Sequence, residues 1–220
     1  MISLHRLRKL FAALALGASL IGSATAALFT EIPDAGQTIG TANNAAVVSP
    51  LFGIRGTLSN EPSAGPDLVD MFRVSIPTGA RFFANTGPGT DPALIADPVL
   101  FLFNALGVGV AMDDESGGFG QASLSTGVLT GGIYFLAIAF AGLEPLDSLG
   151  NPIFDTFGSG GLLSALALAS WFGSPFSLDP SIEGRYAIAT YYVPLPGTLL
   201  LVLVGLAALR TTRKSRSRRA

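Results

Sequence analysis

Short apolar runs separated by turn-forming residues are the feature that most constrains the fold of this 220-residue chain. Glycine and proline fill 27 and 14 positions, and charged residues make up only 13 %. Runs that are broken this often favour many short strands over a helical bundle. In DMFRVSIP, residues 70–77, apolar and polar side chains alternate, which is typical of a half-buried strand.

The chain is therefore predicted to be all-β, with an antiparallel β-sandwich of the jelly-roll type over residues 51–192. Two runs, PVLFLFN and IYFLAIAF, are apolar on both faces, as expected for the central strands of a sandwich. The predicted strands cover residues 51–58, 70–76, 80–85, 98–104, 107–112, 121–129, 133–140 and 185–192.

Two segments do not follow this pattern. Residues 27–50 are small and polar, and we expect a lead-in with little regular structure. Residues 141–184 form a long insertion before the last strand, and its GLLSALALAS stretch fits either a short helix or a buried strand. Trp171 follows that stretch and is interpreted as a packing anchor, because a lone aromatic side chain beside apolar sequence usually packs.

Residues 1–26 have the three parts of a secretory signal peptide. A basic segment with Arg6, Arg8 and Lys9 precedes an apolar run, and Ala24 and Ala26 fit the small residues before a cleavage site. The apolar run has about 12 residues, whereas a membrane-spanning helix needs about 20. We therefore expect a signal helix, export and cleavage after residue 26, with an N-terminal membrane anchor as the alternative.

The body of the chain is acidic and lacks most catalytic side chains. Residues 27–209 hold four arginines against all fifteen acidic residues, which gives a net charge of −11. Such a body does not bind nucleic acid or an anionic membrane through its bulk, but it can bind cations. It has no histidine, cysteine or lysine, which excludes serine triads, cysteine–histidine pairs and histidine-ligated zinc. A secreted hydrolase that acts through two carboxylates is the remaining enzymatic alternative.

An acidic turn, MDDESGGFG, places Asp113, Asp114 and Glu115 in a row, where their charges repel one another. Either water screens them in a solvated turn, or calcium does so, since calcium takes roughly six to eight oxygen ligands. If the strands pair as predicted, Asp70 and Asp97 begin strands near this turn. The candidate calcium ligands are therefore Asp70, Asp97, Asp113, Asp114 and Glu115, and no other cofactor is expected.

A series of short motifs runs through residues 67–142 in a fixed order. It consists of Asp70 and Phe72; Asp97, Pro98, Leu100, Leu102, Phe103 and Asn104; Asp113, Asp114 and Gly117; and Gly132, Tyr134 and Leu136. In this order the motifs resemble the bacterial pre-peptidase C-terminal domain family. The resemblance implies a small jelly-roll-like sandwich that serves as a non-catalytic accessory or binding module of secreted proteins.

Residues 193–220 combine a proline motif, an apolar stretch and a basic cluster. The motif is Val193, Pro194, Leu195 and Pro196, and residues 199–209 are apolar apart from Gly205. Counted from Val193, the apolar segment has 17 residues, the lower limit for a membrane-spanning helix. The basic residues after it, which predict a cytoplasmic tail, are Arg210, Arg213, Lys214, Arg216, Arg218 and Arg219.

This three-part order resembles the PEP-CTERM sorting signal of Gram-negative bacteria, with Leu195 in place of glutamate as in a variant form of the motif. The resemblance implies that an exosortase, a membrane enzyme, cleaves near Pro194–Pro196 and passes the body from the inner membrane to the cell surface or the extracellular matrix. A permanent C-terminal membrane anchor is the alternative.

The expected protein is thus an exported, non-enzymatic surface or extracellular-matrix protein. Its expected partners are an exosortase, transiently, and the membrane before processing, but not nucleic acid. Extracellular polysaccharide and calcium are candidate ligands of the sandwich, and a membrane-anchored module that binds either one is the alternative. Candidates for sugar stacking are Phe82, Phe83, Tyr191 and Tyr192, although core packing explains these side chains equally well.

Overall fold

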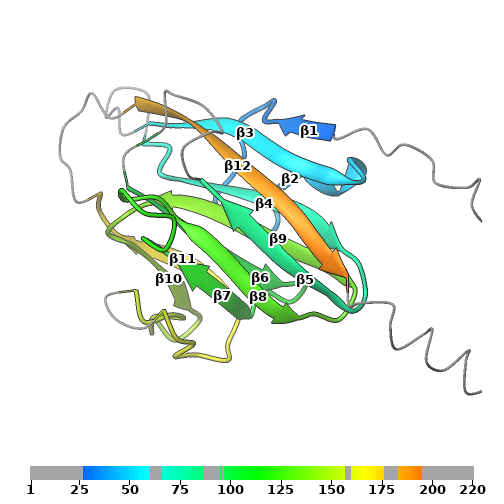
Figure 1. Ribbon diagram of the computed structural model, residues 1–220. Helices are drawn as coiled ribbons and strands as arrows, with labels where there is room; N and C mark the ends of the chain where they lie inside the picture. Colours follow the sequence, from blue (N-terminus) through cyan, green and yellow to red (C-terminus); the bar gives the residue numbers. More distant parts are fainter. Residues whose placement is uncertain are drawn as a thin grey trace, which may run out of the picture.

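The computed structural model describes residues 27–59, 66–86, 95, 97–156, 160–175 and 183–194. These residues form two five-stranded sheets that pack face to face and a separate two-stranded hairpin (Figure 1). The all-β sandwich predicted from the sequence is thus confirmed. The predicted signal peptide and residues 195–220, with the predicted C-terminal helix, lie outside the described residues.

Each sheet is named here after its central strand. The β12 sheet contains, in spatial order, β1 (Ala27–Thr30), β3 (Leu51–Ser59), β12 (Glu183–Pro194), β5 (Ala80–Asn85) and β8 (Ser123–Val128). The β9 sheet contains β2 (Asn43–Asn44), β4 (Val69–Ile76), β9 (Gly132–Phe140), β6 (Pro98–Asn104) and β7 (Gly109–Asp113). The hairpin consists of β10 (Leu143–Asp147) and β11 (Leu168–Gly173), and a short 3-10 turn, Ala45–Val47, follows β2.

The hydrophobic core lies between the two sheets, because side chains along each strand alternate between its two faces. Leu136 of β9 pairs with Phe72 of β4, and both side chains are fully buried. Phe82 of β5 and Ile188 of β12 contribute from the other sheet and are also at most 1 % exposed. Burial of each of these side chains contributes about 2 kcal/mol to folding.

Both sheets are mixed, because their first strands run parallel to their neighbours. The lead-in, residues 27–50, supplies β1, which pairs in parallel with β3, and β2, which pairs in parallel with β4. The expected purely antiparallel order is therefore wrong at these two edges. The two strands have only four and two residues, too few to show an alternating pattern in the sequence.

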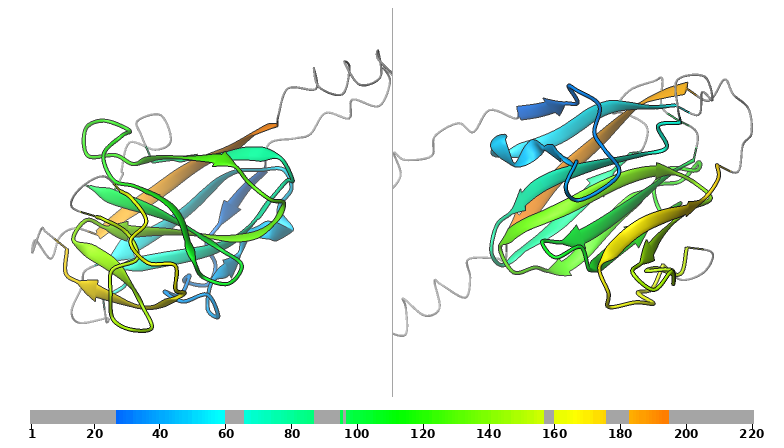
Figure 2. Two further views of the ribbon diagram at one scale, coloured as in Figure 1. Left: turned by 90° about the horizontal axis from the view of Figure 1, so that it is seen from below. Right: turned by 180° about the vertical axis from the view of Figure 1, so that it is seen from behind.

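The long insertion forms a third layer over the outer face of the β9 sheet (Figure 2). Its aromatic rings contact that face, since Phe154 and Trp171 lie 5.8 and 5.4 Å from the ring of Phe101. The indole nitrogen of Trp171 also donates to the carbonyl oxygen of Gln37 at 2.8 Å. The interpretation of Trp171 as a packing anchor is confirmed, and the end of the GLLSALALAS stretch begins strand β11.

The predicted strands agree with the observed ones to within two residues at each end. The last strand extends furthest beyond its predicted limit, because Val193 and Pro194 still pair with Arg81 and Ala80 of β5. Proline is tolerated at the end of a strand, where no further N–H group is needed for pairing. No helix in the described part of the chain is both long enough and apolar enough to cross a membrane.

We predict that Trp171→Ala lowers the free energy of unfolding by about 3 kcal/mol, the lower end for loss of a large aromatic side chain, because the indole is only partly buried. The matched control is Phe172→Ala, since Phe172 is the next residue on β11 and is 66 % exposed. Its effect should be about 0.5 kcal/mol or less. Chemical denaturation of the three chains measures both effects, and equal losses would contradict the third-layer packing.

Candidate metal centre

Four carboxylates from two distant parts of the sequence converge at one end of the sandwich. Glu31, Asp34 and Asp70 each offer an oxygen that lies within 4.8 Å of the others. Asp67 lies beside them, since a hydrogen bond with Asp34 and the charge of Glu31 both raise its pKa. We call these four residues the first acidic cluster.

Glu31 is fixed by backbone groups on both sides of its carboxylate. It follows β1 directly, and its Oε1 accepts a hydrogen bond from the N–H group of Ala35 at 2.6 Å. Its Oε2 accepts from the N–H group of Thr57 on β3 at 3.0 Å. Gly56 makes this approach possible, because a Cβ atom there would collide with Glu31 Oε2 and with the hydroxyl of Tyr186. The parallel pairing of β1 with β3 thus places Glu31 at the cluster.

Asp70 is the most deeply buried member of the cluster. It lies on β4, is 0 % exposed, and its Oδ2 accepts a 2.6 Å hydrogen bond from the hydroxyl of Tyr186 on β12. Its Oδ1 is buried as well and has no hydrogen-bond partner among the described residues. A buried carboxylate oxygen without a donor costs free energy unless a cation or water satisfies it.

Burial and the neighbouring acids raise the pKa values in the first acidic cluster. Burial raises the pKa of Asp67 to about 7, and the charges of Asp34 and Glu31 add to the effect. Burial raises the pKa of Asp70 to about 10, and the hydrogen bond from Tyr186 opposes this only in part. The pKa of Tyr186 is itself raised, first by burial and then by the charge of Asp70. Without a cation the cluster therefore retains protons at neutral pH, which a divalent cation can displace.

The other predicted ligands form a separate group, the second acidic cluster, which consists of Asp97, Asp113, Asp114 and Glu115. Burial raises the pKa of Asp114 to about 6, with further contributions from the charges of Asp97, Glu115 and Asp113. Burial raises the pKa of Asp97 too, followed by the charge of Glu115. The charges of these four predicted residues therefore act on one another, but in the described part of the chain only Glu31, Asp34 and Asp70 bring three carboxylate oxygens within 4.8 Å of one another.

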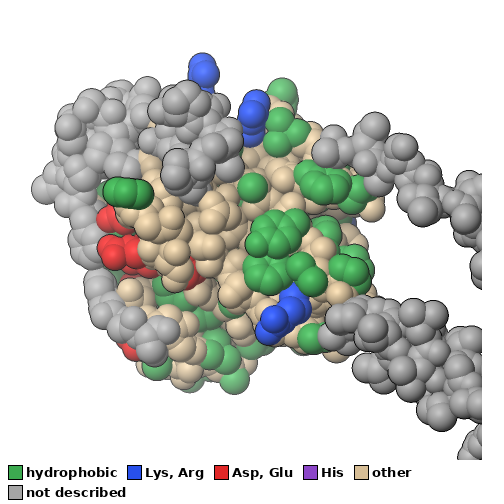
Figure 3. Space-filling view, in the orientation of Figure 1, with side chains coloured by type: hydrophobic (Ala, Val, Ile, Leu, Met, Phe, Trp, Pro, Cys, Tyr) green, Lys and Arg blue, Asp and Glu red, His purple; other side chains and the backbone are tan. Residues whose placement is uncertain are grey.

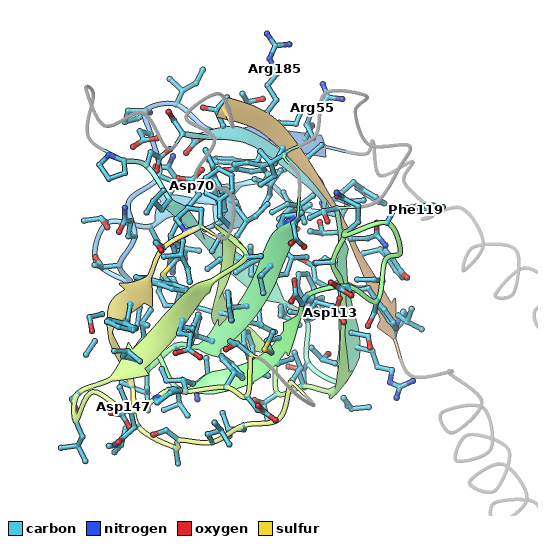
Figure 4. All side chains as sticks on the ribbon, turned by 90° about the vertical axis from the view of Figure 1, so that its left-hand side faces the viewer. Arg55, Asp70, Asp113, Phe119, Asp147 and Arg185 are labelled. Carbon is cyan, nitrogen blue, oxygen red and sulfur yellow. The ribbon has the colours of Figure 1, made fainter. Side chains whose placement is uncertain are left out.

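Asp70, the fifth predicted ligand, lies with the first acidic cluster instead. Val69 of β4 and Val99 of β6 both pair with Ala139 of β9, so the two clusters lie toward the same end of the β9 sheet. They are separated by one intervening strand, or about 10 Å. Figure 4 shows Asp70 and Asp113 well apart. In Figure 3 the visible acidic side chains gather at the left of the drawn face, away from the arginines.

Three members of the first acidic cluster were not found by sequence reasoning. Glu31 and Asp34 are three residues apart, as are Asp67 and Asp70, and these two pairs are the signal that the sequence offered. The pairs are far apart along the chain, but both are held against β3: β1 pairs with it, and Asp67 forms a bridge with Ser59 at its end.

Residues of the predicted sorting signal are described only in part. Val193 and Pro194 are the last residues of β12, whereas Leu195 and Pro196 lie outside the described residues. The signal-cleavage alanines and the basic cluster also lie outside them. Of the candidate sugar-stacking residues, Phe82 is buried, whereas Phe83 and Tyr191 stack on each other with ring centroids 4.7 Å apart.

The first acidic cluster suits a hard divalent cation. All of its side-chain donors are carboxylate oxygens, the ligand type that calcium prefers. The unpartnered Oδ1 of buried Asp70 is an acceptor that an ion would satisfy. Calcium therefore fits this donor set, whereas thiolate or imidazole sites for softer metals cannot form from these residues.

Comparison with known proteins gives a limited result. No family model and no curated protein matches the chain. Among solved structures, the pre-peptidase C-terminal domain of a collagenase from Bacillus anthracis resembles it with a TM-score of 0.36 and 12 % sequence identity. The resemblance covers 68 % of this chain and 94 % of that one. Membership of that family stays a prediction from the sequence motifs.

We predict that, in EDTA, the melting temperature of the chain falls as the pH rises from 5 to 8. In this range the folded chain retains protons on Asp67, Asp70 and Asp114 that the unfolded chain has lost, because their pKa values in the folded chain exceed the ordinary value of 3.8 for an aspartate side chain. Stability therefore decreases with rising pH. Calcium should weaken or reverse the trend, since the ion replaces the protons. Thermal unfolding followed by circular dichroism tests this, and a rise with pH in EDTA would contradict it.

Proposed function

We propose that this chain is an exported, non-enzymatic surface or extracellular-matrix protein whose β-sandwich binds calcium at the first acidic cluster. We further propose that the sandwich is a jelly-roll module of the pre-peptidase C-terminal type and that an exosortase processes its tail. Extracellular polysaccharide is the proposed macromolecular ligand of the exported body. The motif order between residues 67 and 142 and the three-part tail support these assignments.

The observation that carries the calcium proposal is the meeting of three carboxylates, one of them on the fully buried Asp70, with Asp67 beside them. The oxygen atoms of Glu31, Asp34 and Asp70 are close enough to share one ion. Glu31 and Asp34 belong to the lead-in, whereas Asp67 lies just before β4 and Asp70 on it, so an ion would tie the lead-in to the sandwich. Calcium sites in extracellular modules bind with dissociation constants of roughly 0.1 to 1 mM, and we expect this range here.

The geometry favours cation binding over hydrolysis by a carboxylate pair. A glycosidase needs two carboxylates on opposite sides of a sugar, roughly 5 to 9.5 Å apart, with substrate access to both. Oxygen atoms of Glu31, Asp34 and Asp70 lie within 4.8 Å of one another, and Asp70 is 0 % exposed. A sugar ring does not fit between such groups, whereas an ion does.

The tail supports processing at the membrane. A short apolar stretch, followed by six basic residues within 210–219, gives the orientation that places the body outside the cytoplasm. The proline motif precedes the apolar stretch, where the PEP-CTERM resemblance implies cleavage. A retained anchor is the second candidate, favoured by the same apolar stretch.

We predict that Asp34→Asn weakens calcium binding at least tenfold while leaving the fold intact, because Asp34 is an exposed ligand. The matched control is Glu144→Gln, which also removes one negative charge but retains an acceptor for the hydroxyl of Thr156. Isothermal titration of the full chain in mild detergent measures both. Equal affinities in the wild type and Asp34→Asn would overturn the proposal for this site.

We also predict that protein recovered from the outside of the native host ends near residues 194–196, as determined by mass spectrometry of its C-terminal peptide. Replacement of the five arginines beyond residue 209 by serine, with Lys214 kept, should reduce the processed fraction, because the membrane orientation is weakened. Recovery of an intact Ala220 terminus from the cell surface would instead establish the retained anchor.

A further inference from the structure

Buried oxygen atoms without a hydrogen-bond donor are concentrated in the two acidic clusters. The described residues contain four such side-chain atoms, and one is Oδ1 of Asp70 in the first cluster. The other three are Oδ1 of Asp97, Oδ1 of Asp114 and Oε1 of Gln121. Buried polar atoms in folded proteins nearly always have hydrogen-bond partners. Three unpartnered oxygens in one region therefore suggest that a single ligand could satisfy all of them.

Gln121 is held against the segment that leads into β6. It is only 8 % exposed, and its Nε2 donates to the carbonyl oxygen of Ile95 at 3.4 Å. That bond uses the amide nitrogen and leaves Oε1 as an acceptor beside the segment that carries Asp97. The preceding residue, Gly120, lies against the same carboxylate, because a Cβ atom there would be 3.6 Å from Asp97 Oδ1.

The acidic turn is fixed by its own backbone, so Asp114 does not depend on a ligand for its position. Oδ1 of Asp113 accepts hydrogen bonds from the N–H groups of Ser116 at 3.1 Å and Ser123 at 2.6 Å. The N–H group of Gly117 donates to the carbonyl oxygen of Gln121 at 2.8 Å. Asp113 is therefore engaged in holding the turn, whereas its neighbour Asp114 keeps a free oxygen.

On the other side, the backbone of Asp97 is anchored to the sandwich. Its carbonyl oxygen accepts a hydrogen bond from the N–H group of Ala141 at 3.0 Å, directly after β9. Asp97 has a φ of 57°, a conformation that few residues other than glycine adopt. The carboxylate is thus presented by a fixed backbone, and its charge and that of Asp114 lie close enough to influence each other.

We propose that Asp97, Asp114 and Gln121 bind a second divalent cation of the calcium class. Two carboxylates and a neutral amide oxygen are ligands that calcium accepts, and water supplies the remaining positions. The ion would give each of the three orphan oxygens a partner and would screen the repulsion within the acidic turn. This second site uses no residue of the first acidic cluster, so an experiment can support or contradict it independently of the proposed function.

Counting bound ions tests the proposal. Equilibrium dialysis of the full chain in detergent against radioactive calcium should give two ions per wild-type chain. The double variant Asp97→Asn/Asp114→Asn should bind one ion, Asp34→Asn should also bind one, and the combined triple variant should bind none. Phe119→Ser is the matched control, since Phe119 lies in the same turn, is 99 % exposed and offers no side-chain oxygen in the native chain. It should still bind two.

Thermal unfolding separates a ligand role from a purely structural one. In EDTA the double variant should melt at or above the wild-type temperature, because it lacks the repulsion between two unpartnered carboxylates. In calcium it should melt several degrees below the wild type, because it lacks one bound ion. A lower melting temperature in EDTA, or an equal gain from calcium in both chains, would overturn the second site.

The two proposed sites can fail separately. If the wild type binds one ion that is lost in the double variant but kept in Asp34→Asn, the second site stands and the first is wrong. If that ion is lost in Asp34→Asn and kept in the double variant, the second site is wrong.

Discussion

The hydrogen bond between Tyr186 and Asp70 joins the two sheets at the end of the sandwich on which the proposed chemistry depends. Tyr186 comes from the central strand of one sheet and Asp70 from β4 of the other, and the two oxygens lie 2.6 Å apart. Both residues are almost fully buried, and the ring of Phe72 packs against that of Tyr186. A polar contact in such a place fixes how the sheets meet, because an unpaired carboxylate there would be costly.

The same contact leaves a buried carboxyl oxygen that the described residues do not satisfy. Tyr186 satisfies one oxygen of Asp70, while the other has no partner among the described residues, and three further acids surround it. The second acidic cluster, on the other side of β9, repeats this condition with its own unpartnered oxygens. At both clusters, the repulsion between neighbouring acids and the lack of hydrogen-bond donors favour the binding of a cation.

The sequence was sufficient for the strands with a clear apolar pattern, but not for β1, β2, β10 and β11 or for the assembly of the candidate metal centre. The limits of β6 could be predicted because its seven residues, PVLFLFN, and the turns beside them contain that information locally. The acidic turn could be found because its acids are contiguous. Glu31 and Asp34 could not be linked to Asp67 and Asp70, because their proximity depends on β1, whose four residues pair in parallel at the edge of a sheet built mainly from later sequence. The role of Gln121 was hidden for a related reason, since only the folded turn places its amide beside residues 95–97.

The end of β12 also bears on how the body and the tail can part. Val193 and Pro194, at the end of β12, still pair with Arg81 and Ala80 of β5. A protease therefore meets strand-paired backbone up to Pro194. A peptide bond within the strand is shielded by its neighbour, whereas a bond after Pro194 belongs to none of the pairings in the described part of the sheet. Scission at that position would leave every described strand whole, and the freed body would keep its folding free energy without any rearrangement.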